Sequence, residues 1–288
     1  MIIDLVKILK DYKIASCNVS MTGYYWPDVE FKNTKLNPLS IDVRKVKVKK
    51  IDTKKIFLKY IKSGMQEITL LPRLYHGIIS RNTLDNIKNL SGSYFPGPSP
   101  DIANATVASL VLDQHYLVRL PVIISGTAYK SAAGMGVRGE HKGELSKVSQ
   151  ISSNVANEWN SHIPKLWLMN TIWPESCLKA LEKANAQNYI EQFNFYPIYS
   201  RIWLKYKEYR PILKEFIITP VDCFLTVYEG FKDLLKWLEK RINKKVRVIL
   251  KKEYVCKTKI SLSEACEITN LNNKKHDNID IIRKRLKK

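Results

Sequence analysis

Asp101 is the carboxylate in this sequence whose surroundings best suit proton transfer. It follows Ser99 and Pro100, residue types preferred at the start of a helix, and mostly apolar or small residues come after it. A carboxylate on such a rigid element, at the edge of a cleft, can act as a general base. The helix dipole alone also favours a carboxylate in the first turn, so the spacing leaves both interpretations open.

A glycine-rich stretch, residues 134–139 (GMGVRG), could approach a phosphate group closely. G-x-G-x-x-G binds a dinucleotide when it follows a strand directly and opens an apolar helix. The preceding strand is expected to end near Ser125, and polar residues follow the glycines. We therefore expect a loop in which Arg138, His141 and Lys142 donate to a diphosphate or are simply solvated.

His76 and Trp26 are further candidates for contact with a ligand. His76 could be a base or a ligand, although a buried, hydrogen-bonded histidine is the more common case. Trp26 belongs to an aromatic sequence, YYWP, that could stack on a sugar or fill the edge of a core. The sequence contains no H-E-x-x-H, G-x-S-x-G, P-loop or Asp-x-Asp pattern, and its nearest approach to the last is 28–30 (DVE).

The hydrophobic spacing predicts both helices and strands around these residues. The expected helices are 2–9, 53–61, 80–90, 102–112, 144–160, 175–187, 199–216 and 229–242. Thr53 can cap the second of them, and Pro174 is expected to open the helix at 175–187. The expected strands are 14–20 and 121–125, with an edge strand among Val43, Val46 and Val48. Loops are expected at 23–38, 91–100 and 126–143. Ser261 and Glu264 form a capping-box pattern for a last helix.

Composition and charge limit the kinds of protein that this sequence can encode and the kinds of partner that it can bind. The 288 residues are 45% hydrophobic, with no apolar run long enough to span a membrane, and five scattered cysteines favour reduced thiols in a cytosol. The net charge of +21 is concentrated in residues 32–62 and 240–288. This pattern attracts nucleic acid, an anionic membrane face or a phosphate-bearing substrate, and a bias toward lysine explains it equally well. Few aromatic residues accompany the basic ones, which disfavours nucleic acid.

Four segments together resemble part of a known enzyme family. They are 24–28 (YYWPD), 71–77 (LPRLYHG), 94–101 (YFPGPSPD) and 120–126 (LPVIISG). In order and spacing they are similar to the acceptor half of bacterial glycosyltransferases of family 2, which have the GT-A fold. The resemblance covers about residues 1–165. It implies sugar transfer from a nucleotide-sugar donor to a surface-glycan or lipid-linked acceptor.

The resemblance also assigns roles to residues. Asp101 would take the proton of the acceptor hydroxyl, and His76, Tyr94 and Trp26 would lie in or beside the acceptor cleft. Arg138 and Lys142 would contact the donor diphosphate from a flexible loop, and His141 on that loop would contact a divalent metal, Mn or Mg. The Asp-x-Asp that holds this metal in the family belongs to a preceding nucleotide-binding half. We therefore expect the chain to be a piece or one half of a split enzyme, weak or inactive without a complementing N-terminal chain.

The resulting prediction is an α/β protein with an incomplete GT-A-like mixed sheet, flanking helices and a mainly helical C-terminal extension. Residues 1–165 would form the acceptor-side domain, 166–245 a helical extension and 246–288 a basic tail. The extension suits a cytoplasmic protein attached peripherally to the inner, anionic face of a membrane. The alternative is a basic nucleic-acid-binding protein without catalytic activity.

Overall fold

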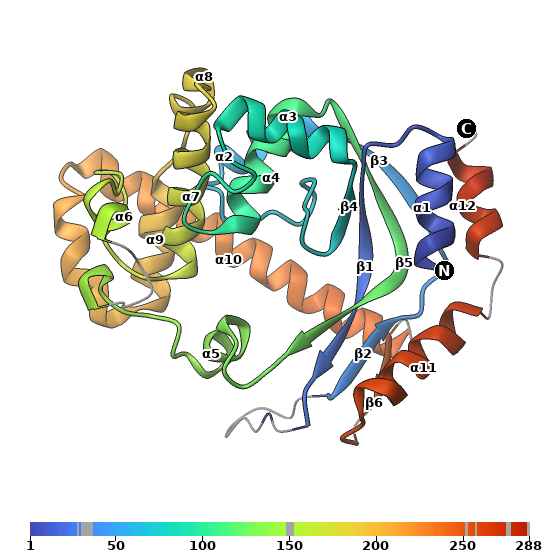
Figure 1. Ribbon diagram of the computed structural model, residues 1–288. Helices are drawn as coiled ribbons and strands as arrows, with labels where there is room; N and C mark the ends of the chain where they lie inside the picture. Colours follow the sequence, from blue (N-terminus) through green and yellow to red (C-terminus); the bar gives the residue numbers. More distant parts are fainter. Residues whose placement is uncertain are drawn as a thin grey trace.

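The computed structural model describes residues 1–27, 29, 37–147, 153–250, 253–256, 258–274 and 278–286. Asp28 and Glu30, the two carboxylates of the sequence nearest to an Asp-x-Asp pattern, lie outside the described residues. The centre of the molecule is a mixed six-stranded sheet in the order β3-β5-β1-β2-β6, with β4 also paired to β1 (Figure 1). Its strands are β1 (Ser16–Tyr25), β2 (Leu39–Asp42), β3 (Val48–Asp52), β4 (Gly77–Ile79), β5 (Gln114–Thr127) and β6 (Glu253–Cys256). The expectation of an α/β protein with a mixed sheet and flanking helices is confirmed.

The two long central strands, β1 and β5, are parallel, and the other pairings are antiparallel. Their register shifts on both sides of Ser20, the residue opposite Pro121. A proline has no N–H for the ladder, and a bulge is one of the few ways in which a strand accommodates it. For this reason β5 is much longer than the predicted strand 121–125, which began at the proline. β1 likewise continues through Tyr25, into the segment expected to be a loop.

One face of the sheet is covered by helices from both ends of the chain. α1 (Ile2–Asp11) packs Leu5, Ile8 and Leu9 against the sheet, as its helical spacing predicts. α12 (Asn278–Leu286) adds Ile282 to the same cluster, so the two terminal helices lie side by side (Figure 1). α11 (Leu262–Lys274) covers β2 farther along, and begins with the predicted reciprocal capping bonds between Ser261 and Glu264.

A larger helical layer lies on the other side of the sheet (Figure 1). Its helices are α2 (Thr53–Ile61), α3 (Arg81–Ser91), α4 (Pro100–Val111), α6 (Ser153–Asn157), α7 (Met169–Lys183), α8 (Gln187–Ile190), α9 (Tyr196–Lys205) and the 3-10 helix Lys207–Glu215. The central member is α4, which is buried on nearly all sides as its apolar and small residues predict. Asp52, not the expected Thr53, caps α2 by accepting a hydrogen bond from the Lys55 N–H.

The expectations for the glycine-rich stretch and for Pro174 are wrong. The glycine-rich stretch is not entirely a loop, because α5 (Ala132–Arg138) forms there, with Ser131 accepting a hydrogen bond from the Gly134 N–H. Helix α7 begins before Pro174, which we expected to open it. Pro174 cannot donate to the carbonyl of Asn170, four residues earlier, and the side-chain amide of Gln66 donates to that carbonyl at 3.0 Å instead. This replacement bond explains how the proline fits inside the helix.

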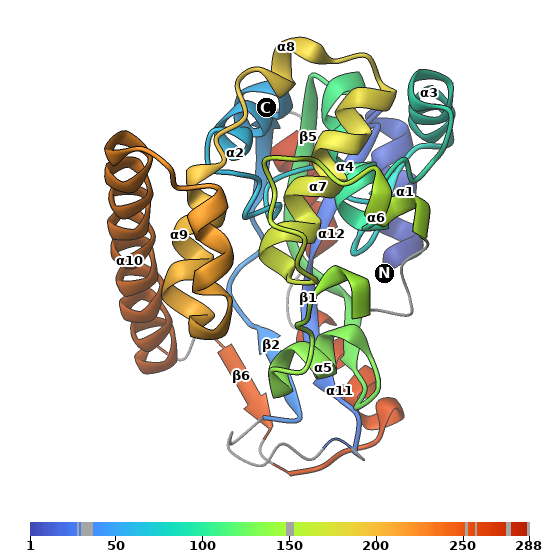
Figure 2. The same ribbon diagram turned by 90° about the vertical axis from the view of Figure 1, so that its left-hand side faces the viewer.

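After α9 the chain runs away from the sheet along one helix, and its last segments then pack on the sheet again. α10 (Pro220–Ile249) is the longest helix of the described residues and runs along the edge of the molecule beside α9 (Figure 2). β6 then pairs with β2, and α11 and α12 follow it back over the sheet. Residues 253–256 and 278–286 are therefore built into the folded structure. The division at residues 165 and 245 stays a prediction. None of the described helices is long and apolar enough to cross a bilayer.

Candidate functional site

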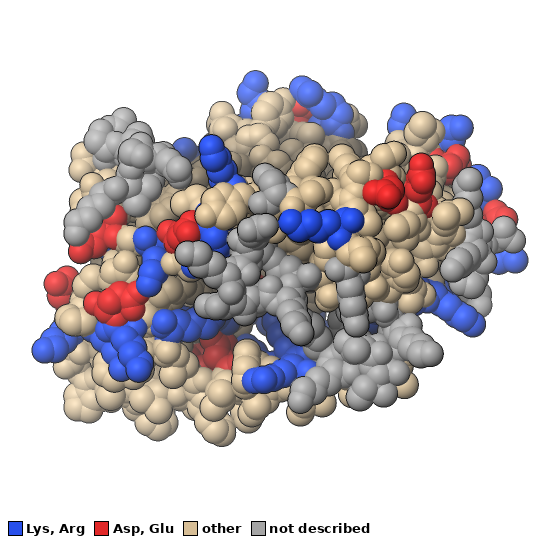
Figure 3. All heavy atoms as spheres, turned by 90° about the horizontal axis from the view of Figure 1, so that it is seen from below, with Lys and Arg blue, Asp and Glu red and all other residues tan. Residues whose placement is uncertain are grey.

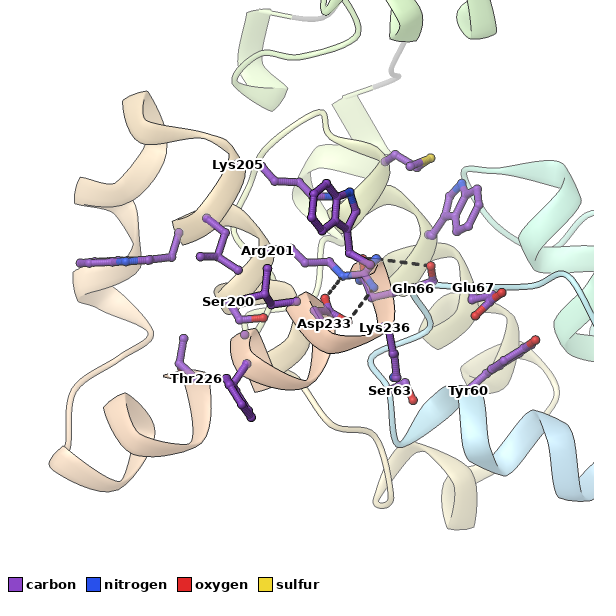
Figure 4. A pocket seen from close by; sticks show the side chains of 18 of the residues that line it. Tyr60, Ser63, Gln66, Glu67, Ser200, Arg201, Lys205, Thr226, Asp233 and Lys236 are labelled. Atoms are coloured by element: carbon purple, nitrogen blue, oxygen red, sulfur yellow. Dashed lines mark hydrogen bonds and ion pairs between the residues drawn. The ribbon is translucent and has the colours of Figure 1, made fainter. Parts of the chain in front are cut away.

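A cavity of about 1780 Å³ lies between the helices on the far side from α1. Its lining comes from α2, α7, α9, α10 and the 3-10 helix Lys207–Glu215, together with Arg73, His76 and Asp101. Figure 4 shows part of this lining, including Gln66, Arg201 and Asp233. The lining carries nine Lys or Arg side chains and four Asp or Glu side chains among many apolar ones. Basic side chains also gather beside a hollow on the underside of the molecule (Figure 3). A cavity of this composition suits a ligand with an anionic part and an apolar part.

Arg73 reaches the cavity from the loop between α2 and β4. The buried side chain of Asn18, in β1, holds this loop by donating to the Leu71 carbonyl at 2.7 Å and accepting from the Arg73 N–H at 3.3 Å. Burial lowers the pKa of the Arg73 guanidinium, and the nearby Asp101 carboxylate opposes that effect. The Nε of Arg73 is buried and has no hydrogen-bond partner among the described residues. The backbone at Arg73 is therefore held in place, and the Nε–H of its side chain remains able to donate to a ligand.

His76 follows on the same loop, with a backbone φ of 62° that an L residue rarely adopts. Its Nε2 lies 3.4 Å from the hydroxyl oxygen of Ser125, in β5. Burial lowers the pKa of the His76 imidazole, and Arg73 lowers it further, whereas Asp101 acts in the opposite direction. His76 is therefore neutral near pH 7 and can donate or accept one hydrogen bond at the cavity wall.

Asp101 lies in the first turn of α4, as Ser99 and Pro100 predict. The Ser99 N–H donates to the hydroxyl of Ser176 in α7 at 2.7 Å, which fixes the start of the helix against its neighbour. The Asp101 side chain is only partly buried and lines the cavity together with Arg73 and His76. The fold therefore brings together a carboxylate, an imidazole and a guanidinium from two segments separated in the sequence.

The opposite wall of the cavity is a polar network between α9 and α10. Arg201 forms an ion pair with Asp233 and donates to the Gln66 side-chain oxygen at 3.2 Å (Figure 4). Asn170 donates to the same oxygen at 2.7 Å. Burial lowers the pKa of the nearby Lys205, and Arg201 adds to that effect. Sequence analysis missed this wall, because its residues are up to 167 positions apart in the 288-residue chain and form no motif.

Two of the predicted acceptor-side residues do not line this cavity. The hydroxyl of Tyr94 accepts from Arg81 at 2.9 Å and donates to Asp85 at 3.1 Å, so it is engaged with α3. Trp26 packs against Gly126, and its ring lies 5.6 Å from that of Tyr24. Side chains alternate along a strand, so Gly126 and Ser125 face opposite sides of β5. Trp26 therefore lies on the other face of the sheet from His76.

The three residues of the expected diphosphate loop also lie outside the cavity lining. Arg138 pairs with Glu140 and stacks its guanidinium over the ring of Tyr129, 3.8 Å from the ring centroid. Lys142 forms an ion pair with Glu208 at 2.6 Å. The ring of His141 lies 5.4 Å from that of Trp167. Each cation is already engaged, and a diphosphate would have to displace a carboxylate from it.

The described residues do not fit the expected divalent metal. Among them, no three His, Cys, Asp or Glu side chains come together as a metal-binding group. His141 lies against an aromatic ring, and the neighbours of Asp101 in the cavity are the cation Arg73 and the neutral His76. Comparison with known proteins gave no matching family model, no matching curated protein and no matching solved structure.

Proposed function

We propose that this chain forms the acceptor side of a sugar-transfer site of the GT-A type, with Asp101 as the base. The donor would be a nucleotide sugar and the acceptor a surface glycan or a lipid-linked glycan. The observation that carries the proposal is the convergence of Asp101, His76 and Arg73 on one large cavity. The same three residues belong to the sequence segments that resemble family 2 glycosyltransferases.

The chemistry that Asp101 would perform is a simple proton transfer. The oxygen of the acceptor hydroxyl attacks the anomeric carbon of the donor sugar while the bond from that carbon to the diphosphate oxygen breaks. The hydroxyl proton passes to the Asp101 carboxylate, and the nucleoside diphosphate leaves with the bonding electrons. Asp101 suits this role because it is partly exposed at the fixed start of a buried helix.

His76 and Arg73 would position the acceptor. A neutral imidazole can donate a hydrogen bond to one sugar hydroxyl or accept one from it. The unpartnered Nε of Arg73 can donate to an oxygen of the acceptor. The excess of basic side chains around the cavity suits an acceptor that carries phosphate.

The proposal is tested by measuring transfer from UDP- and GDP-sugars to oligosaccharide and lipid-linked acceptors. Acceptor binding is measured separately by calorimetry, so that loss of chemistry is distinguished from loss of binding. We expect Asp101→Asn to lower turnover while the Kd for the acceptor changes less than about twofold. Glu67→Gln, a carboxylate at the same cavity that pairs with Lys240, is the matched control and should keep both values.

A further inference from the structure

Helix α10 presents its apolar side chains to solvent. Their spacing of three and four residues places them on one continuous face of the helix, over most of its length. Members at least half exposed include Phe224 (67%), Val227 (65%), Phe231 (59%), Leu235 (50%) and Ile242 (61%). Trp203 and Leu204 of the adjacent α9 are also half exposed, at 49% and 54%. An apolar surface of this extent is unusual on a protein that meets only water.

The face of α10 that packs on the protein is, by contrast, polar or small. Thr226 and Glu229 are buried, a Cβ added to Gly230 would lie 3.5 Å from a Leu204 methyl group of α9, and Asp233 pairs with Arg201. An ordinary surface helix buries its apolar face and exposes its polar one. The orientation of α10 is the reverse, and it is fixed by the ion pair and the close contact at Gly230. The apolar face is therefore held outward by specific contacts.

Basic side chains accompany this apolar face. Lys232 and Arg241 lie over the rings of Tyr228 and Trp237, each 5.0 Å from a ring centroid. Between residues 236 and 250 the sequence has six Lys or Arg and one acidic residue, Glu239. Apolar residues flanked by aromatic and cationic ones are typical of helices that lie in the plane of a lipid bilayer surface.

We infer that α10 docks on the surface of an anionic bilayer, with its axis in the membrane plane and the Phe224–Ile242 face in the lipid. The positive charge selects this occupant over a second copy of the chain, because two α10 helices in contact would bring like charges together. The inference does not rest on the proposed sugar transfer, although Val227 and Phe231 of this face also line the cavity. It assigns the expected membrane contact to one helix, whereas the sequence pointed to the basic segments generally.

The test is flotation of the full chain with vesicles of phosphatidylcholine, with and without phosphatidylglycerol. We expect binding to the anionic vesicles, weakened by salt. The triple variant Phe224→Ser, Phe231→Ser, Leu235→Ser should bind at least ~10-fold more weakly, because three inserted side chains are lost. Lys236→Ala should weaken binding about fivefold, the effect expected for one lysine near an anionic surface. Circular dichroism and Tm confirm that the variants fold.

The matched control is Ile3→Ser with Leu271→Ser, which removes apolar side chains of similar exposure, 67% and 62%, from other helices. This variant should bind vesicles like the wild type. The inference is overturned if vesicles are not bound, or if the triple variant binds as well as the wild type. Light scattering that shows a dimer, lost in the triple variant without vesicle binding, would assign the face to a second copy.

Discussion

The buried side chain of Asn18 accepts a hydrogen bond from the backbone N–H of Arg73 at 3.3 Å. This bond joins the central strand β1 to the loop that brings Arg73 and His76 to the cavity. The same Asn18 side chain donates to the Leu71 carbonyl at 2.7 Å, so one side-chain amide makes two hydrogen bonds to the backbone of this loop. The geometry of the candidate site is therefore determined inside the sheet as well as at the cavity.

Asn18→Ala should destabilise the protein by about 2–4 kcal/mol, because the Leu71 carbonyl and the Arg73 N–H would both be left unpaired. Urea unfolding measures this loss. Asn82→Ala, an exposed position on α3, is the control and should change stability by less than ~0.5 kcal/mol. Equal stability of the two variants would show that the Asn18 bonds do not hold the loop.

Gly77→Ala should be destabilising by ~2 kcal/mol or more. A Cβ on Gly77 would lie 2.2 Å from the Arg73 carbonyl oxygen and 2.7 Å from the Asn18 side-chain oxygen. The backbone would have to move, and such overpacking is costly. In Gly136→Ala the Cβ meets nothing within 4 Å, and this helical position should gain up to ~1 kcal/mol. Thermal unfolding of both variants decides whether the loop is packed this tightly.

Glu175 should make stability depend on pH. Burial raises the pKa of this carboxyl to about 7, above its ordinary value of 4.5. The folded state therefore holds the proton more tightly, so this stabilisation is fully present below pH 4.5 and lost as the pH rises to about 7. The effect is on the order of 3 kcal/mol. In Glu175→Gln this decline should disappear from the pH profile of the free energy of unfolding.

Glu191→Gln, at an exposed position, serves as the control for this profile. It should leave the decline between pH 4.5 and 7 as it is in the wild type. Burial lowers the pKa of His115 to about 4, which makes stability rise over nearly the same interval, so Glu175 is isolated by the difference between the wild-type and Glu175→Gln profiles. A difference that stays constant from pH 4.5 to 7 would contradict the assignment to Glu175.

Local features of the site could be predicted from the sequence, and its assembly could not. Ser99 and Pro100 determine that Asp101 begins a helix, because capping is a property of adjacent residues. The meeting of Asp101 with Arg73 depends on how α4 and the 71–77 loop pack, which no spacing rule gives. Arg138 and Lys142 were expected to be available to a ligand, but each pairs with a carboxylate, Glu140 and Glu208 respectively.

The wrong predictions of secondary structure also arise from contacts between residues distant in the sequence. The sequence rule that proline ends a strand or opens a helix fails at Pro121 and Pro174. At Pro121 a bulge opposite Ser20 lets the strand continue past the missing N–H. At Pro174 the Gln66 amide donates to the Asn170 carbonyl that the proline leaves without a partner. α10 is a further instance, since its apolar spacing predicts a helix but not which face is turned to the protein.

The most direct test of the central claim is the rate of sugar transfer by the wild type and by Asp101→Asn, each supplied with the complementing nucleotide-binding chain, under identical conditions. The donor is a UDP- or GDP-sugar, and the acceptor is one that calorimetry shows to bind. We predict turnover lower by ~10²-fold or more in the variant, with acceptor binding retained. Equal turnover in the two proteins would contradict the role of Asp101 as the base.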